Sequence, residues 1–112
     1  MSENKSDIHI EVQLDNQQQP TAIKWKAVSQ DGPMEQLSKG MLLAFFDKET
    51  KETFKIDLWT NEMQIAEMDR FMFQTLKSLT ETYYKATSNT ELSNHMKSFV
   101  QHFGEYTGII PK

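Results

Sequence analysis

A single switch in hydrophobic period most constrains what this chain can fold into. Between Thr53 and Trp59, apolar residues alternate with mostly polar ones, as in a β-strand with one buried face. From Ile65 onward, apolar residues recur every three or four positions, as in an amphipathic helix. Strands therefore come before helices along the chain, and the sequence predicts an α+β fold.

Three further strands are expected before this switch. The predicted strands are Ile8–Leu14, Ile23–Ala27, Met41–Phe46 and Phe54–Leu58. Residues 30–33 contain glycine and proline and should break the chain after the second strand. Residues 35–39 fit either a strand with a bulge at Gly40 or a short helix opened by Pro33, and both options stay open. Short connections between the strands predict a four-stranded antiparallel meander.

Two C-terminal helices are expected at Ile65–Ala86 and Thr90–Tyr106. A capping box from Ser88 to Glu91 should open the second helix, because a serine hydroxyl and a glutamate three residues later can satisfy free amides. Gly108 is expected to stop that helix. We expect both helices to pack on one face of the four-stranded sheet.

Length and composition favour one small intracellular domain. The chain has 112 residues, and we expect a single domain with residues 1–6 disordered, 7–59 forming the sheet and 62–107 a helical layer. No cysteine is present, which agrees with a reducing compartment. The polar N-terminus and the short apolar run Met41–Phe46 predict a cytoplasmic protein without direct membrane insertion. A net charge of −4 argues against nucleic-acid binding.

The segment that carries the period switch also carries a family resemblance. Lys51–Met63 resembles the gliding motility-associated protein C family, GldC. Further matching segments are Ile23–Trp25, Met41–Leu43, Phe46–Asp47, Gln74–Leu76 and Ala86–Thr87. The resemblance implies a small cytoplasmic accessory protein of the bacterial gliding machinery, and it brings no catalytic residues with it.

No candidate catalytic, metal or cofactor site emerges from the residues. His95 and His102 lie seven positions apart on one helix edge, too far along the axis to bind the same zinc ion. The acids Asp47, Glu52 and Asp57 are expected to pair with nearby lysines or to face water. With only four glycines, the chain also offers no glycine-rich phosphate loop. We therefore expect no enzyme, no cofactor, no metal and no small-molecule substrate.

Surplus apolar residues instead predict a protein-contact surface. The strand Met41–Phe46 is apolar on both faces, and a two-layer domain can cover only one of them. The alternative is a central strand that is shielded by long neighbouring side chains. We expect a protein partner, a homodimer or both, with contact residues Leu42, Phe46, Trp59, Phe71, Phe73 and Tyr84.

The sequence therefore predicts a non-enzymatic accessory or interaction protein associated with gliding motility. One alternative is an export-type chaperone for unfolded clients, because four strands followed by two helices resembles the order in the SecB export chaperone. A second alternative is a small-ligand-binding module, for which a short chain offers little volume.

Overall fold

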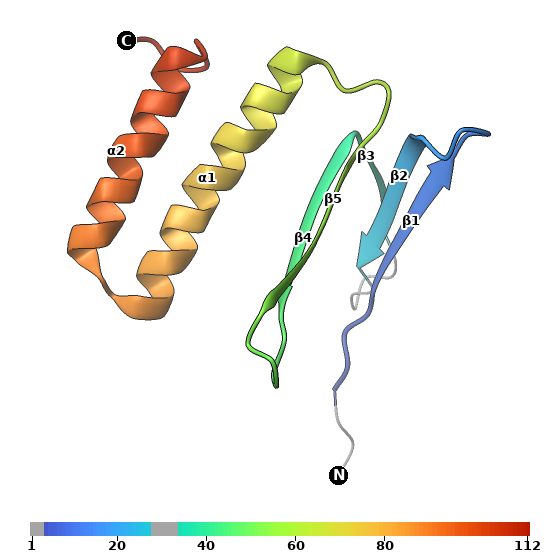
Figure 1. Ribbon diagram of the computed structural model, residues 1–112, viewed down its shortest axis with the longest axis horizontal. Helices are drawn as coiled ribbons and strands as arrows, with labels where there is room; N and C mark the ends of the chain where they lie inside the picture. The colour runs from blue at the N-terminus through green and yellow to red at the C-terminus, as the bar shows by residue number, and fades with distance from the viewer. Residues whose placement is uncertain (1–3, 28–33) are drawn as a thin grey trace. The chain divides into compact units, whose positions relative to one another are not determined.

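The computed structural model describes residues 4–27 and 34–112. Strands come first and helices last, as the period switch predicts (Figure 1). The chain divides into two compact units, Met1–Met63 and Gln64–Lys112, and each is described by itself. The elements are β1 (Ile8–Leu14), β2 (Pro20–Ala27), β3 (Met34–Ser38), β4 (Gly40–Phe46), β5 (Thr53–Trp59), α1 (Ile65–Thr87) and α2 (Thr90–Tyr106).

The predicted single four-stranded meander is wrong. Five strands form two antiparallel sheets, with the orders β1-β2-β3 and β4-β5. Residues 35–39, left open between strand and helix, lie almost wholly in the strand β3. The other strands and both helices were predicted to within a few residues of their bounds. The predicted break at residues 30–33 and the first half of the disorder predicted for 1–6 lie outside the described residues. Residues 4–6 are exposed and belong to no helix or strand. The packing of the helices on a sheet face stays a prediction.

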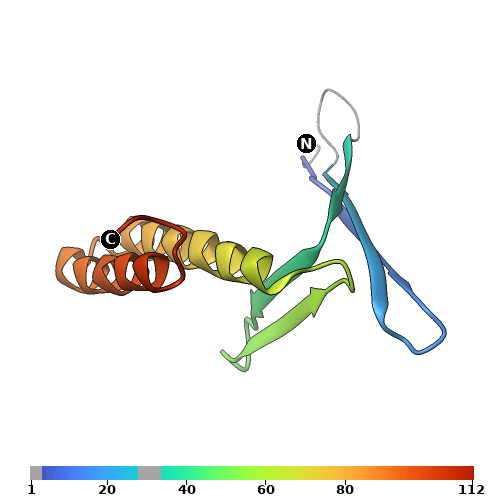
Figure 2. The same ribbon diagram turned by 90° about the horizontal axis from the view of Figure 1, so that it is seen from above.

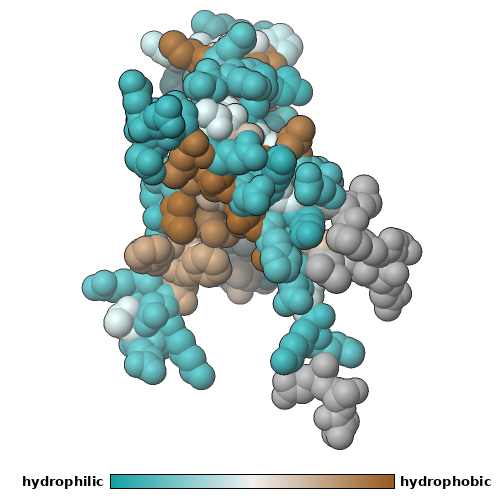
Figure 3. All heavy atoms as spheres, turned by 90° about the vertical axis from the view of Figure 1, so that its right-hand side faces the viewer, coloured by the Kyte–Doolittle hydropathy of each residue, from teal (hydrophilic) through white to brown (hydrophobic). Residues whose placement is uncertain are grey.

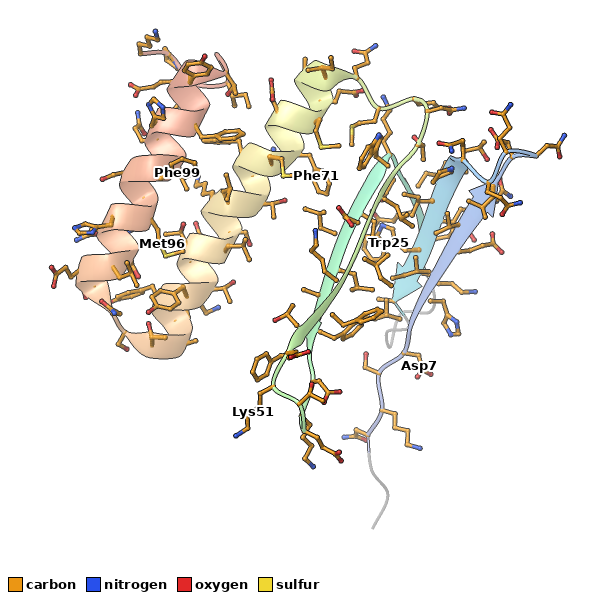
Figure 4. The ribbon with its side chains drawn as sticks, viewed as in Figure 1. Asp7, Trp25, Lys51, Phe71, Met96 and Phe99 are labelled. Atoms are coloured by element: carbon orange, nitrogen blue, oxygen red, sulfur yellow. The ribbon has the colours of Figure 1, made fainter. Side chains whose placement is uncertain are left out.

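The three-stranded sheet has one apolar and one charged face. Ile10 lies opposite Trp25 and Val12 opposite Ile23, so these side chains share a face. On the other face Glu11 lies opposite Lys24. The Trp25 ring lies on the side of β2 that faces β4 and β5 (Figure 4). Burial in β1 does not follow this division, because Ile8, Ile10 and Leu14 are exposed as well.

The two sheets are joined at Lys39, between the end of β3 and the start of β4. Figure 2 shows the sheets diverging from this junction. Two main-chain hydrogen bonds fix it: Thr60 N–H donates to Lys39 O at 2.8 Å, and Asn61 N–H donates to Pro20 O at 3.2 Å. Ile23 and Thr60 are 1% and 2% exposed. The core of this unit therefore includes these residues near the junction of its sheets.

The loop between β4 and β5 is organised by one carboxylate. Asp47 Oδ2 accepts hydrogen bonds from the N–H groups of Glu49, at 3.0 Å, and Thr50, at 2.8 Å. Both bonds lower the pKa of Asp47, because they favour the charged carboxylate, and the bond from Thr50 has the larger effect. Lys51 takes a positive φ of 60° and closes the turn. The loop thereby holds β4 and β5 in register.

The helical unit is an antiparallel pair with a two-residue connection (Figure 1). Ser88 ends α1 in the left-handed conformation, and its N–H donates to Tyr84 O at 2.7 Å. Asn89 caps α2, because its Oδ1 accepts from Leu92 N–H at 3.0 Å. The predicted capping box from Ser88 to Glu91 is therefore wrong. The sequence offered two adjacent capping residues, and Ser88 is used to end α1 instead.

Small side chains mediate the contact between α1 and α2. The buried residues of the two helices are Thr80 on α1 and Ser93, Val100 and Gly104 on α2. An added Cβ on Gly104 would lie 2.6 Å from Phe73 Cε1 and 2.8 Å from Ile110 Cγ1. The predicted stop at Gly108 is confirmed, with φ 78° just after the helix ends. Gly104 is thus needed for close approach and Gly108 for the turn.

We expect Ser93→Ala to stabilise the protein by about 1 kcal/mol. The Ser93 hydroxyl is buried without a hydrogen-bond partner among the described residues, and alanine both removes that unpaired group and favours the helix. Urea unfolding of the variant and wild type measures the effect. A stability loss of similar size would mean that the hydroxyl has a partner in solution.

Candidate protein-contact surface

The pairing of β4 with β5 creates a ribbon with two unlike faces. Met41 lies opposite Leu58, Leu43 opposite Ile56 and Phe45 opposite Phe54. Side chains directly opposite in an antiparallel pair share a face. We call this side the apolar face, and it consists of Met41, Leu43, Phe45, Phe54, Ile56 and Leu58.

The opposite side combines apolar and charged residues. Leu42 lies opposite Asp57, Ala44 opposite Lys55 and Phe46 opposite Thr53. Lys55 Nζ lies 3.3 Å from Asp57 Oδ2, and both side chains are about half exposed. We call this side the mixed face, and it consists of Leu42, Ala44, Phe46, Thr53, Lys55, Asp57 and Trp59.

The structure brings together the three contact residues that the sequence predicted on the strands. Leu42 and Phe46 lie on the mixed face of β4, and Trp59 lies on the same side at the end of β5, opposite Gly40. Phe46 is 70% exposed and Trp59 54% exposed, whereas Leu42 is half-buried. Two aromatic side chains therefore remain accessible at the two ends of this face.

The three contact residues predicted on α1 do not form one surface. Phe71 projects away from α2 (Figure 4), whereas Phe73 lies against the backbone of Gly104 in α2. Tyr84 is exposed near the end of the helix. Phe73 thus has a packing role inside the helical unit. A partner contact at Phe71 or Tyr84 stays a prediction.

Sequence reasoning identified the charged part of the mixed face only in part. It expected Asp57 to pair with a lysine such as Lys55 or to face water, and the ion pair between the two confirms the first option. It named Lys55, but not Asp57, as a neighbour of Leu42 and Phe46. The signal was present in the strict alternation of β5, which puts Lys55, Asp57 and Trp59 on one side. Which side of β4 they join depends on the hairpin register, set by the loop around Asp47.

Exposed apolar side chains are not confined to the mixed face. The space-filling view of the side that bears the strands shows a brown apolar patch surrounded by hydrophilic side chains (Figure 3). Exposed apolar residues of the helical unit include Leu79 on α1 and Phe99 on α2. Such surface is typical of proteins that bind other proteins.

Residues 4–27 and 34–112 contain hollows but no metal-binding cluster. No three His, Asp or Glu side chains there gather closely enough to hold a metal ion. A hollow of about 550 Å³ lies along β1 and β2, lined by Lys24 and Trp25 among others, and one of about 310 Å³ lies between α1 and α2, lined by Phe73 and Val100 among others. Both volumes fall within the range of ligand sites. No helix in this part of the chain combines the length and apolar character needed to cross a bilayer.

Comparison with known protein families identifies the family of this chain. The family model described as "Gliding motility-associated protein GldC-like" matches residues 20–109, from the start of β2 to the turn after α2. The chain belongs to the GldC-like family. This match confirms the resemblance seen around Lys51–Met63. The GldC-like family is associated with gliding motility and is not known as enzymatic. No curated protein and no solved structure matches the chain significantly.

Proposed function

We propose that this GldC-like protein is a non-enzymatic accessory component of the gliding motility machinery and that it binds a protein partner through the mixed face of the β4–β5 ribbon. The family match over residues 20–109 carries the association with motility. The exposed aromatic residues of the ribbon support binding to a protein. Cytoplasmic location is part of the same proposal.

The composition of the mixed face favours it over the apolar face as the contact surface. Protein interfaces that form and dissociate are about as apolar as the rest of a protein surface, with aromatic residues enriched in their centres. The mixed face has this character, since Phe46 and Trp59 flank the Lys55–Asp57 ion pair. A strand face that is apolar throughout, such as that of Phe45 and Phe54, is more typical of the interior of a fold.

Affinity capture with two matched variants tests this proposal. Phe45 and Phe46 are neighbours in β4, both are exposed, and they lie on opposite faces. The tagged protein is expressed in its native host and cross-linked, and the captured proteins are identified by mass spectrometry. We expect wild type to retain one or a few defined proteins and Phe46→Glu to retain about tenfold less of them, because a charge enters a dry contact.

The control is Phe45→Glu, with circular dichroism used to confirm that each variant is folded. If folded Phe45→Glu loses the captured proteins and Phe46→Glu keeps them, the apolar face is the contact surface and our assignment is wrong. Capture of many unrelated unfolded proteins, by contrast, would support the chaperone alternative.

A further inference from the structure

The strand β5 has an outer edge that is free to pair. Within residues 4–27 and 34–112, β5 pairs only with β4. Asp47 N–H donates to Glu52 O at 2.9 Å, and Thr60 N–H donates to Lys39 O at 2.8 Å, so even-numbered residues direct their main-chain groups toward β4. Main-chain groups alternate in direction along a strand. Those of Thr53, Lys55, Asp57 and Trp59 therefore point outward from this edge.

The order of side chains along β5 is complementary to itself. When two copies run antiparallel with the two Ile56 residues opposite each other, Lys55 of each copy lies opposite Asp57 of the other. On the opposite side of the new sheet, Phe54 of each copy lies opposite Leu58 of the other. Opposite charges and apolar side chains are thus matched at the same time.

Neighbouring registers lack this match. A shift that centres the pair on Lys55 places two lysines opposite each other, and a shift that centres it on Asp57 places two aspartates opposite each other. Like charges directly opposite in a sheet are destabilising. A shift by one residue pairs outward main-chain groups with inward ones and loses the hydrogen bonds. The arrangement centred on Ile56 is therefore the favoured one.

We propose that this protein forms a homodimer in which β5 of one copy pairs antiparallel with β5 of a second copy about a twofold axis at Ile56. The product is a continuous four-stranded sheet with the order β4-β5-β5-β4. A two-stranded ribbon is marginally stable by itself, and pairing extends it to a more stable size. The mixed faces of both copies then lie on one side of this sheet. The dimer does not depend on the proposed role in motility.

A charge-exchange experiment tests the contact between Lys55 and Asp57. Lys55→Glu makes both positions acidic, and Asp57→Lys makes both basic. We expect each variant alone to dimerise about tenfold more weakly than wild type, because two attractive cross-strand pairs become repulsive. An equimolar mixture of the two variants should form a heterodimer, since every cross-strand pair is then opposite in charge. Native mass spectrometry and sedimentation velocity at several concentrations distinguish these species.

A cysteine variant tests the register independently. The chain has no cysteine, so Ile56→Cys introduces a single thiol. In the proposed dimer the two new thiols lie opposite each other at a pair without main-chain hydrogen bonds, where the Cα atoms are about 4.5 Å apart and a disulfide can form. We expect rapid disulfide-linked dimer formation on mild oxidation. Phe54→Cys is the control, because its thiol would lie opposite Leu58.

The outcomes separate cleanly. Wild type that sediments as a monomer at all concentrations overturns the proposal. The proposal is also overturned if the single charge variants dimerise as tightly as wild type, or if Phe54→Cys cross-links as fast as Ile56→Cys. Either result would show that the copies meet through another surface or register. Loss of capture by Phe46→Glu with an intact dimer would leave this proposal standing and support the partner site separately.

Discussion

Ile23→Ala is expected to lower the free energy of unfolding by about 2–5 kcal/mol. Ile23 is 1% exposed and lies between Val12 of β1 and Ser38 of β3, close to the junction of the two sheets. Truncation removes apolar contacts and leaves a cavity, because the surrounding strands can collapse only in part. Urea unfolding followed by circular dichroism measures the change.

Leu37→Ala is the matched control for this prediction. Leu37 is also an aliphatic residue of the three-stranded sheet, but it is 74% exposed. We expect its truncation to change stability by less than about 0.5 kcal/mol. Equal losses in Ile23→Ala and Leu37→Ala would show that the buried side of this sheet has been assigned incorrectly.

Gly104→Leu should destabilise the helical unit by about 1–3 kcal/mol. Even a Cβ atom at this position would come within 2.6 Å of Phe73 Cε1, and a larger side chain must push α1 and α2 apart. Leucine is a better helix former than glycine, so a loss of stability can be attributed to the helix contact rather than to propensity. Thermal unfolding followed by helical circular dichroism measures the loss.

Two further variants make this second prediction specific. Asn94→Leu places the same side chain at an exposed position of α2 and should not destabilise the unit. Phe73→Ala combined with Gly104→Leu should recover part of the loss, because the space vacated by the ring accommodates the new side chain. A double variant whose loss is the sum of the two single losses would mean that Phe73 and residue 104 are not in contact.

Local pattern was sufficient for the type and bounds of most elements. The alternation in Ile8–Leu14 and the helical repeat in Thr90–Tyr106 depend on residues near in sequence, and both elements have the predicted bounds. The division of the strands into two sheets depends instead on hydrogen bonds between residues far apart, such as Asn61 to Pro20. Those pairings have no local signature, so the bend at Lys39 was missed.

The candidate surface was predictable in part for the same reason. Alternation alone places Leu42 and Phe46 on one side of their strand, and the structure agrees. The charged neighbours Lys55 and Asp57 join them only through the register of the hairpin. The close contact between Gly104 and Phe73 could not be predicted, because glycine carries no hydrophobic signal.

The two-residue connection at Ser88 and Asn89 has a consequence for the order of folding. Contacts between α1 and α2 join segments that are close in sequence, so little loop entropy opposes their formation. The bond from Asn61 to Pro20 must instead close a loop that includes the four strands β2 to β5. During synthesis, the sheet unit leaves the ribosome first but cannot complete its junction until Asn61 has emerged. The helical pair, made last, can form as soon as its own residues are available.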